Sequence, residues 1–291
     1  MTSQIQALIA SEHLPPNYID LLDRWWRPLA IHIAKWREAA ARPLVIGING
    51  AQGSGKSTLC RFLEEALLPD LGLQAVTLSL DDLYLTRAER DGLARTVHPL
   101  LRTRGVPGTH DTTLGRSILQ DLLVGRPTQF PQFSKALDDR LPPLHSRIVD
   151  APADVILFEG WCVGASPQKP SELAVPINTL EAEFDPAGIW RAYVNDQLER
   201  PYADWFAQID HLVMLKAPSF ESVLRNRILQ EHKLRAASPH APAAMDDGQV
   251  NVFISHYERL TKHMIVQMAS SADICFELDD DQNVIGSTGL H

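Results

Sequence analysis

The sequence contains little cysteine, with three residues among 291. Cys60, Cys162 and Cys275 form no Cys-x-x-Cys pair, so neither a disulfide framework nor a zinc site is predicted. We expect reduced thiols that pack as small hydrophobic side chains.

The chain also lacks a long apolar run and a surplus of basic residues. No stretch approaches the ~20 apolar residues of a membrane span, and residues 1–18 lack the basic start and apolar core of a signal peptide. The 27 Lys and Arg are outnumbered by 36 Asp and Glu, which argues against nucleic-acid binding. We therefore expect a cytoplasmic protein without nucleic-acid or membrane partners. A small anionic substrate stays compatible, because basic residues can cluster locally.

From residue 43 onward, short apolar runs alternate with helical patterns. This alternation predicts an α/β fold, with a parallel sheet flanked by helices on both faces. We expect strands at 43–50, 75–80, 154–160, 211–216 and, as the last, 274–278. Helices are expected at 58–68, 220–233 and 250–268. The segments 125–152 and 235–248 are predicted to be loops, with a possible lid at 225–250.

A glycine-rich turn lies between the first strand and its helix, where residues 50–57 match G-x-x-x-x-G-K-[ST]. In this motif backbone amides face phosphate oxygens, and the helix N-terminus adds its positive end. Lys56 would reach the β- and γ-phosphates of ATP, and the Ser57 hydroxyl would bind Mg²⁺. The motif predicts a P-loop NTPase three-layer sandwich. The predicted nucleotide-binding residues are Gly50, Ala51, Gln52, Gly53, Ser54, Gly55, Lys56, Ser57 and Thr58.

Acidic residues end two of the predicted strands, at the edge where open α/β sheets bind ligands. Glu159 would hold Mg²⁺ together with Ser57, and Asp81 would orient an acceptor hydroxyl and accept its proton. Helix capping is the alternative for Glu159 and for the Asp81-Asp82 pair. Two arginines on the helix after the fourth strand would neutralise charge during transfer, or form a solvated face. The predicted catalytic residues are Lys56, Asp81, Glu159, Arg225 and Arg227.

Residues 18–41 show mostly helical spacing of large apolar side chains, including three tryptophans, with a break or kink expected at Pro28. A stripe facing the core explains this spacing, and a partner surface is the alternative. We expect residues 1–41 to form an N-terminal helical extension and residues 42–291 to form the P-loop kinase domain.

Five stretches carry a resemblance to a known family: residues 47–58, 79–86, 104–111, 158–162 and 194–195. Together they resemble the D-glycerate 3-kinases of plant and fungal type, P-loop kinases related to uridine kinase, phosphoribulokinase and pantothenate kinase. The resemblance spans about residues 40–285. It implies ATP-dependent phosphorylation of D-glycerate to 3-phospho-D-glycerate, with Asp81 as base and Glu159 beside magnesium. It also implies an acceptor site formed by Asp81, Tyr84, Arg104, Thr109, His110, Asp111, Lys135 and Arg140.

Within that implied site, Arg104 would pair with a substrate carboxylate. His110 and Asp111 would either bind the substrate hydroxyls or fix the loop, and the residues alone favour a structural His110. Where the family typically has Pro-x-Tyr-x-Lys and then Gly-Arg-Gly-Asp-Arg, this chain has Phe133 and no glycines, but it keeps Lys135 and Arg140. The difference lies on the acceptor side.

Three hypotheses are kept for the function. The first is a D-glycerate kinase, and the second is the same chemistry on a nucleoside, sugar acid or other hydroxy acid. The third is an ATP-binding regulator without phosphoryl transfer, which the presence of both Asp81 and Glu159 disfavours. The oligomeric state and the attacked hydroxyl stay open.

Overall fold

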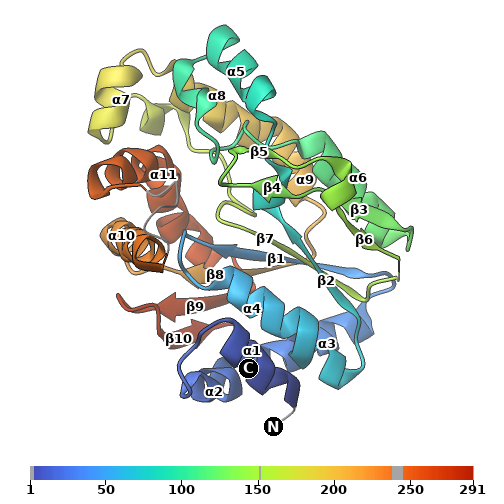
Figure 1. Cartoon of the computed structure of the whole chain (residues 1–291). Coiled ribbons are helices and arrows are strands. Elements are labelled where there is room, and N and C mark those ends of the chain that lie inside the picture. Colours follow the sequence, from blue (N-terminus) through green and yellow to red (C-terminus); the bar gives the residue numbers. More distant parts are fainter. Residues whose placement is uncertain (1–2, 151, 238–244, 291) are drawn as a thin grey trace.

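A twisted sheet runs through the centre of the computed structural model, which describes residues 3–150, 152–237 and 245–290 (Figure 1). Its strand order is β10-β9-β8-β1-β7-β2. Neighbouring strands are parallel, except that β10 is antiparallel to β9. The strands are β1 Leu44–Gly50, β2 Ala75–Ser79, β7 Val155–Gly160, β8 His211–Lys216, β9 Ile274–Leu278 and β10 Val284–Thr288.

Side chains of the central strands alternate between two hydrophobic cores, one on each face of the sheet. In β7, Ile156 and Phe158 belong to one core, and Val155 and Leu157 belong to the other. This is the two-residue period of a pleated strand that is buried on both sides. The three-layer P-loop sandwich predicted from the sequence is therefore confirmed.

The N-terminal helices cover one of these faces. They are α1 Ser3–Ser11, α2 Tyr18–Leu21 and α3 Arg27–Ala39, and a π-helical turn at Leu22–Trp26 precedes α3. Pro28 lies just after the π-helical turn, so the chain stays helical from Tyr18 to Ala39 and the change in hydrogen-bond pattern falls where proline has no amide hydrogen to donate. Leu22, Trp26 and Ile33 are buried in the same core as the sheet, so the core-facing stripe is confirmed. The domain boundary at residue 41 stays a prediction.

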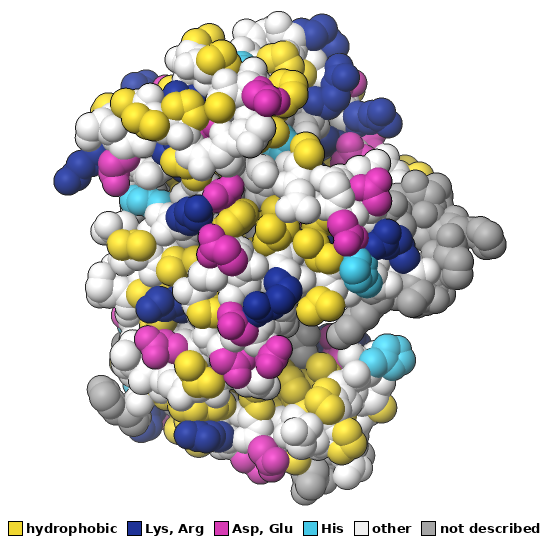
Figure 2. All heavy atoms as spheres, turned by 90° about the vertical axis from the view of Figure 1, so that its left-hand side faces the viewer, with side chains coloured by type: hydrophobic (Ala, Val, Ile, Leu, Met, Phe, Trp, Pro, Cys, Tyr) yellow, Lys and Arg dark blue, Asp and Glu magenta, His cyan; other side chains and the backbone are white. Residues whose placement is uncertain are grey.

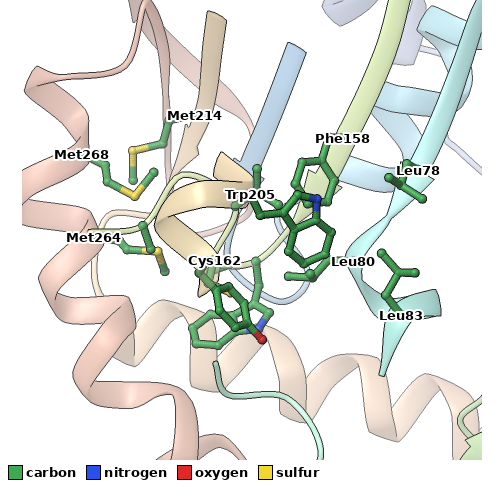
Figure 3. Close-up of a cluster of buried hydrophobic side chains, with 14 of the residues drawn as sticks. Leu78, Leu80, Leu83, Phe158, Cys162, Trp205, Met214, Met264 and Met268 are labelled. Atoms are coloured by element: carbon green, nitrogen blue, oxygen red, sulfur yellow. The ribbon is translucent and has the colours of Figure 1, made fainter. Parts of the chain in front are cut away.

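Helix α4, Lys56–Phe62, continues as a π-helical turn at Leu63–Leu67 and packs on the same face. The opposite face is covered by α6 Thr112–Leu123, α9 Ala203–Phe206 and α11 Asp247–Gln267. Trp205 and Phe158 lie at the centre of that core, with ring centroids 4.7 Å apart (Figure 3). Gly115 lets α6 approach, because a Cβ there would lie 2.2 Å from the Trp205 ring.

Several predicted boundaries differ from the structure. The helix predicted at 220–233 extends to Ala237 as α10 Phe220–Ala237, and residues 238–244 of the predicted lid lie outside the described residues. The strand at 274–278 is not the last, because β10 follows it. The segment 125–152 is not simply loop, because it contains two short antiparallel pairs. These pair β3 Thr128–Phe130 with β6 Arg147–Val149, and β4 Phe133–Ser134 with β5 Asp139–Arg140.

Three further helices form the upper part of the molecule in Figure 1: α5 Arg87–Thr96, α7 Thr179–Phe184 and α8 Ile189–Gln197. The face that includes this region carries interspersed positive and negative side chains (Figure 2). Among the described residues, no helix is long and apolar enough to cross a membrane. Cys60, Cys162 and Cys275 are free and buried, which confirms their expected role as packed thiols.

Candidate active site

The turn between β1 and α4 is shaped to wrap an anion. Gly53 and Gly55 have φ angles of 79° and 86°, which only glycine adopts without strain. A Cβ at Gly50 would lie 2.3 Å from Ser54 Oγ, so the loop curls back on itself. Lys56 then opens α4, whose free amides and dipole point toward the loop. This is the geometry of a phosphate cradle.

Glu159 lies at the end of β7, next to this cradle. Strand register pairs it with Ser79 of β2, whose hydroxyl donates to Glu159 Oε1 at 2.7 Å. The Ser57 hydroxyl donates to the same oxygen at 3.3 Å. Oε2 is buried without a hydrogen-bond partner, and Lys56 Nζ lies 3.9 Å away. Glu159 and Ser57 thus lie together, as predicted.

An unpartnered buried carboxylate oxygen beside a serine hydroxyl fits a hydrated Mg²⁺ ion. Mg²⁺ usually binds one or two carboxylates together with substrate phosphates and waters. In the described part of the chain, no group of three His, Cys, Asp or Glu side chains could hold a metal ion by itself. The corner formed by Ser57 and Glu159 therefore suits an ion that arrives with the nucleotide.

Asp81 follows β2, in a short 3₁₀ turn at Leu80–Leu83. Its Oδ1 accepts a hydrogen bond from the Tyr84 hydroxyl at 2.8 Å, and Lys135 Nζ lies 2.7 Å from its Oδ2. Burial by itself would raise the pKa of Asp81. The charges of Lys135 and Lys56 and these two hydrogen bonds outweigh that effect and hold the pKa well below its usual range. Asp81 is therefore a carboxylate, and the field of Lys56 reaches it.

The loop of residues 104–111 is fixed by its own side chains. The Thr109 hydroxyl donates to Val106 O at 2.7 Å and accepts from Gly105 N at 2.9 Å. Asp111 caps α6 by accepting from Leu114 N at 2.9 Å, so Thr109 and Asp111 hold the loop in shape.

His110 is buried behind Tyr84, and the two rings stack with centroids 4.6 Å apart. Its Nδ1 lies 2.6 Å from the Tyr202 hydroxyl, which also accepts from Gly108 N at 3.1 Å. Burial lowers the pKa of His110 to about 3, so the ring is neutral. His110 supports Tyr84, which agrees with the structural role that the residues alone favoured.

The β4–β5 hairpin contacts Asp82 and Tyr84 on the predicted acceptor side, which comprises residues 81–84, 104–111 and 133–140. Asp82 does not cap the next helix, since Thr86 caps α5; Asp82 Oδ1 instead accepts from Phe133 N at 3.1 Å. The Phe133 ring packs against Tyr84 at 5.1 Å and against the Arg104 guanidinium at 5.6 Å. The phenylalanine that departs from the family pattern therefore has a packing role between these two side chains.

The hairpin and its neighbours bring together the three cations predicted for the acceptor. Arg140 Nη2 donates to Tyr84 O at 2.9 Å and lies 3.4 Å from Asp111 Oδ2. Arg104 forms an ion pair with Asp138 of the hairpin. Lys135 holds Asp81, so all three cations border the same carboxylate-lined region.

Three known proteins with similar sequences or structures are named as kinases. The chain is 34% identical over 235 residues to the uncharacterized kinase mug58 of Schizosaccharomyces pombe, covering 77% of this chain and 82% of that protein. It is 33% identical over 241 residues to the chloroplastic D-glycerate 3-kinase of Arabidopsis thaliana, covering 79% of this chain and 49% of that protein. The solved structure of D-glycerate 3-kinase from Cryptococcus neoformans matches with a TM-score of 0.74 at 26% identity, covering 92% of this chain and 98% of that one.

The chain belongs to the D-glycerate 3-kinase family of P-loop kinases. No protein-family model matches it. The resemblance seen in its motifs is thus confirmed across most of the chain.

Two predicted catalytic arginines of this kinase have partners away from Asp81. Arg225 Nη2 donates to Asp280 O at 3.0 Å, in the β9–β10 turn. Arg227 Nη2 lies 2.6 Å from Glu231 Oε2, one turn along α10. Their catalytic roles stay predictions. The β9–β10 turn also brings Gln282 against the phosphate cradle, because Gln282 Nε2 would lie 3.4 Å from a Cβ at Gly53.

Arg90 is a site-supporting residue that no motif pointed out. It is 1% exposed on α5 and donates to three backbone carbonyls, those of Leu85, Arg102 and Asp138. Arg90 thereby connects α5 with the segment that leads into the 104–111 loop and with the β4–β5 hairpin. Arg90 is one of three arginines on the polar helix α5, so the sequence gives no signal that distinguishes the buried one.

Proposed function

We propose that this kinase transfers the γ-phosphoryl group of ATP, with Mg²⁺, to the 3-hydroxyl of D-glycerate. The observation that carries the proposal is the placement of Asp81 just after β2, beside the strand end that holds Glu159. Ser79, two residues before Asp81, pairs with Glu159 in the sheet and donates to its Oε1 at 2.7 Å. That placement joins a phosphate cradle to a carboxylate suited to an acceptor hydroxyl.

The proposed roles follow from the contacts. The amides of residues 50–58 and the Lys56 ammonium would bind the β- and γ-phosphates. Ser57 and Glu159 would hold Mg²⁺, which when bound neutralises phosphate charge. Asp81 would orient the hydroxyl and accept its proton as the phosphoryl group transfers. Its low pKa makes it a weak base, and the loose transition state of phosphoryl transfer needs no stronger one.

The acceptor side favours a hydroxy acid over a neutral alcohol. Arg104, Lys135 and Arg140 all border it, and a carboxylate would find hydrogen-bonding cations there. The Tyr84 and Phe133 rings pack edge to face beside these cations, with centroids 5.1 Å apart. The plant and fungal relatives named as D-glycerate 3-kinases support this choice.

The test is ADP release from MgATP with a panel of acceptors at equal concentration. The panel contains D-glycerate, L-glycerate, glycerol, a sugar acid and a nucleoside. We expect D-glycerate to give the highest kcat/KM. ADP release with D-glycerate no faster than with buffer would reject this acceptor, and a higher value for another panel member would replace it.

A further inference from the structure

The cations on the acceptor side are each paired with a carboxylate. The pairs are Arg104–Asp138, Arg140–Asp111 and Lys135–Asp81. Only the third pair involves the carboxylate that we propose for the acceptor hydroxyl. An ammonium 2.7 Å from Asp81 Oδ2 stands where that hydroxyl would bind.

The Lys135–Asp81 pair is the easiest of the three to exchange. The Lys135 side chain is 63% exposed, whereas those of Arg104 and Arg140 are 20% and 19% exposed. Arg104 also stacks on the Phe133 ring, and Arg140 also donates to Tyr84 O. An ion pair as exposed as that of Lys135 adds little net stability, because water competes for both charges.

Contacts other than those of Lys135 hold Asp81 and the hairpin in place. The Tyr84 hydroxyl keeps Asp81 Oδ1 in place, and Tyr84 is itself buried against His110. Asp82 fixes the hairpin through Phe133 N. The lysine ammonium can therefore move without unfolding the hairpin, and its departure would free Oδ2 alone.

We propose that Lys135 is a latch that makes phosphoryl transfer depend on a negatively charged acceptor. Without acceptor, its ammonium occupies Asp81 Oδ2; when an acceptor binds, the ammonium moves to the acceptor carboxylate. The inference rests on the proposed function.

In the transfer, the acceptor oxygen bonds to the γ-phosphorus, and the bond from that phosphorus to the β–γ bridging oxygen breaks. ADP leaves with the electron pair of the broken bond, and the hydroxyl proton passes to Asp81.

Two consequences distinguish this latch from a merely structural lysine. Water cannot use the occupied Asp81, so ATP hydrolysis without acceptor is suppressed. A neutral alcohol offers no negative charge to draw the ammonium away, so glycerol is a poor acceptor. Loss of the Lys135 ammonium should therefore raise ATP hydrolysis without acceptor and lower phosphoryl transfer to D-glycerate.

The experiment compares the full chain with Lys135→Met and Lys135→Arg, measuring ADP release without acceptor, with D-glycerate and with glycerol. For Lys135→Met we expect hydrolysis without acceptor to rise about tenfold. We expect kcat/KM for D-glycerate to fall roughly 10- to 100-fold, the usual effect of losing a charge-assisted hydrogen bond. The preference for D-glycerate over glycerol should fall with it, and Lys135→Arg should restore part of that preference. Leu137→Ala, at the exposed tip of the same hairpin, is the matched control and should change each rate less than twofold.

Equal loss of all activities in Lys135→Met would overturn the latch, as would an unchanged rate of hydrolysis without acceptor. If wild type turns over no D-glycerate but Lys135→Met still hydrolyses ATP faster, the latch stands and the proposed acceptor fails. Thermal unfolding checks the fold of each variant, and the exposure of Lys135 predicts an unchanged midpoint.

Discussion

The nucleotide side and the acceptor side of this site are built in different ways. The nucleotide side uses one contiguous turn, residues 50–58, whose backbone amides we propose to bind the phosphates, and a strand end held by register. The acceptor side joins segments around residues 81, 104–111 and 133–140 through side-chain pairs. We therefore expect phosphate recognition to tolerate changes in most side chains, and acceptor recognition to depend on individual pairs.

We expect the largest effect on the nucleotide side, at Lys56. Lys56→Ala should lower kcat about 10³-fold, because a preorganised positive charge on the transferred group is lost. ADP release under saturating MgATP and acceptor measures the effect. Lys35→Ala, an exposed position on α3, should leave the rate unchanged. A Lys56→Ala enzyme that keeps a tenth of the wild-type kcat would contradict the assignment.

We expect the next largest effect at Asp81, the carboxylate proposed to bind the acceptor hydroxyl. Asp81→Asn should lower kcat roughly 10²- to 10³-fold, because the amide cannot accept the hydroxyl proton. Affinity for an ATP analogue, measured by calorimetry, should change less than threefold, which separates the two sides. Asp204→Asn on the exposed part of α9 is the control. Equal losses in nucleotide affinity and turnover would show that Asp81 belongs to the nucleotide side.

Arg90 tests whether the acceptor side is held together by a buried side chain. Arg90→Met should destabilise the protein by roughly 3 kcal/mol, since carbonyls and Asp138 lose their buried cation. Thermal unfolding should show a midpoint roughly 5–10 °C lower. Arg95→Met, exposed on the same helix, should unfold like wild type. Wild-type stability of Arg90→Met would mean that the three segments are held by other contacts.

We expect the smallest effect at His110, whose lowered pKa fixes the direction in which the unfolding free energy changes with pH. Its folded pKa of about 3 lies below the ordinary 6.5, so the unfolded chain binds the proton first as the pH falls. Its stability contribution is complete above about pH 6.5 and is lost as the pH falls toward 3. Between pH 7 and pH 5, wild type should lose about 2 kcal/mol more unfolding free energy than His110→Phe. Urea unfolding at both pH values measures this difference, and equal losses would contradict a buried neutral His110.

The sequence predicted the nucleotide side better than the acceptor side for a physical reason. Gly53 and Gly55 set a local backbone geometry and Lys56 opens the helix that follows, so one short motif indicates the whole turn. The acceptor residues were indicated by resemblance, but their partners were not, because Lys135 and Asp81 are 54 residues apart. Nothing local indicates such a pair.

The fold shows the same division. Continuous apolar runs predicted β7 and β8 closely, since strands buried on both faces have a distinctive composition. The strand β10 was missed, because it is an edge strand with mixed burial and small polar residues. The hairpin at 133–140 was missed because its strands are two residues long and are held by Asp82 and Arg90 from elsewhere.

The most direct test of phosphoryl transfer is phosphorus NMR of the reaction of the full chain with MgATP and D-glycerate. The account predicts a new phosphate-ester signal split into a triplet by the two hydrogens of a primary carbon, together with the signals of ADP. A doublet would place the phosphate on the secondary hydroxyl. Inorganic phosphate as the sole new product besides ADP would contradict the account.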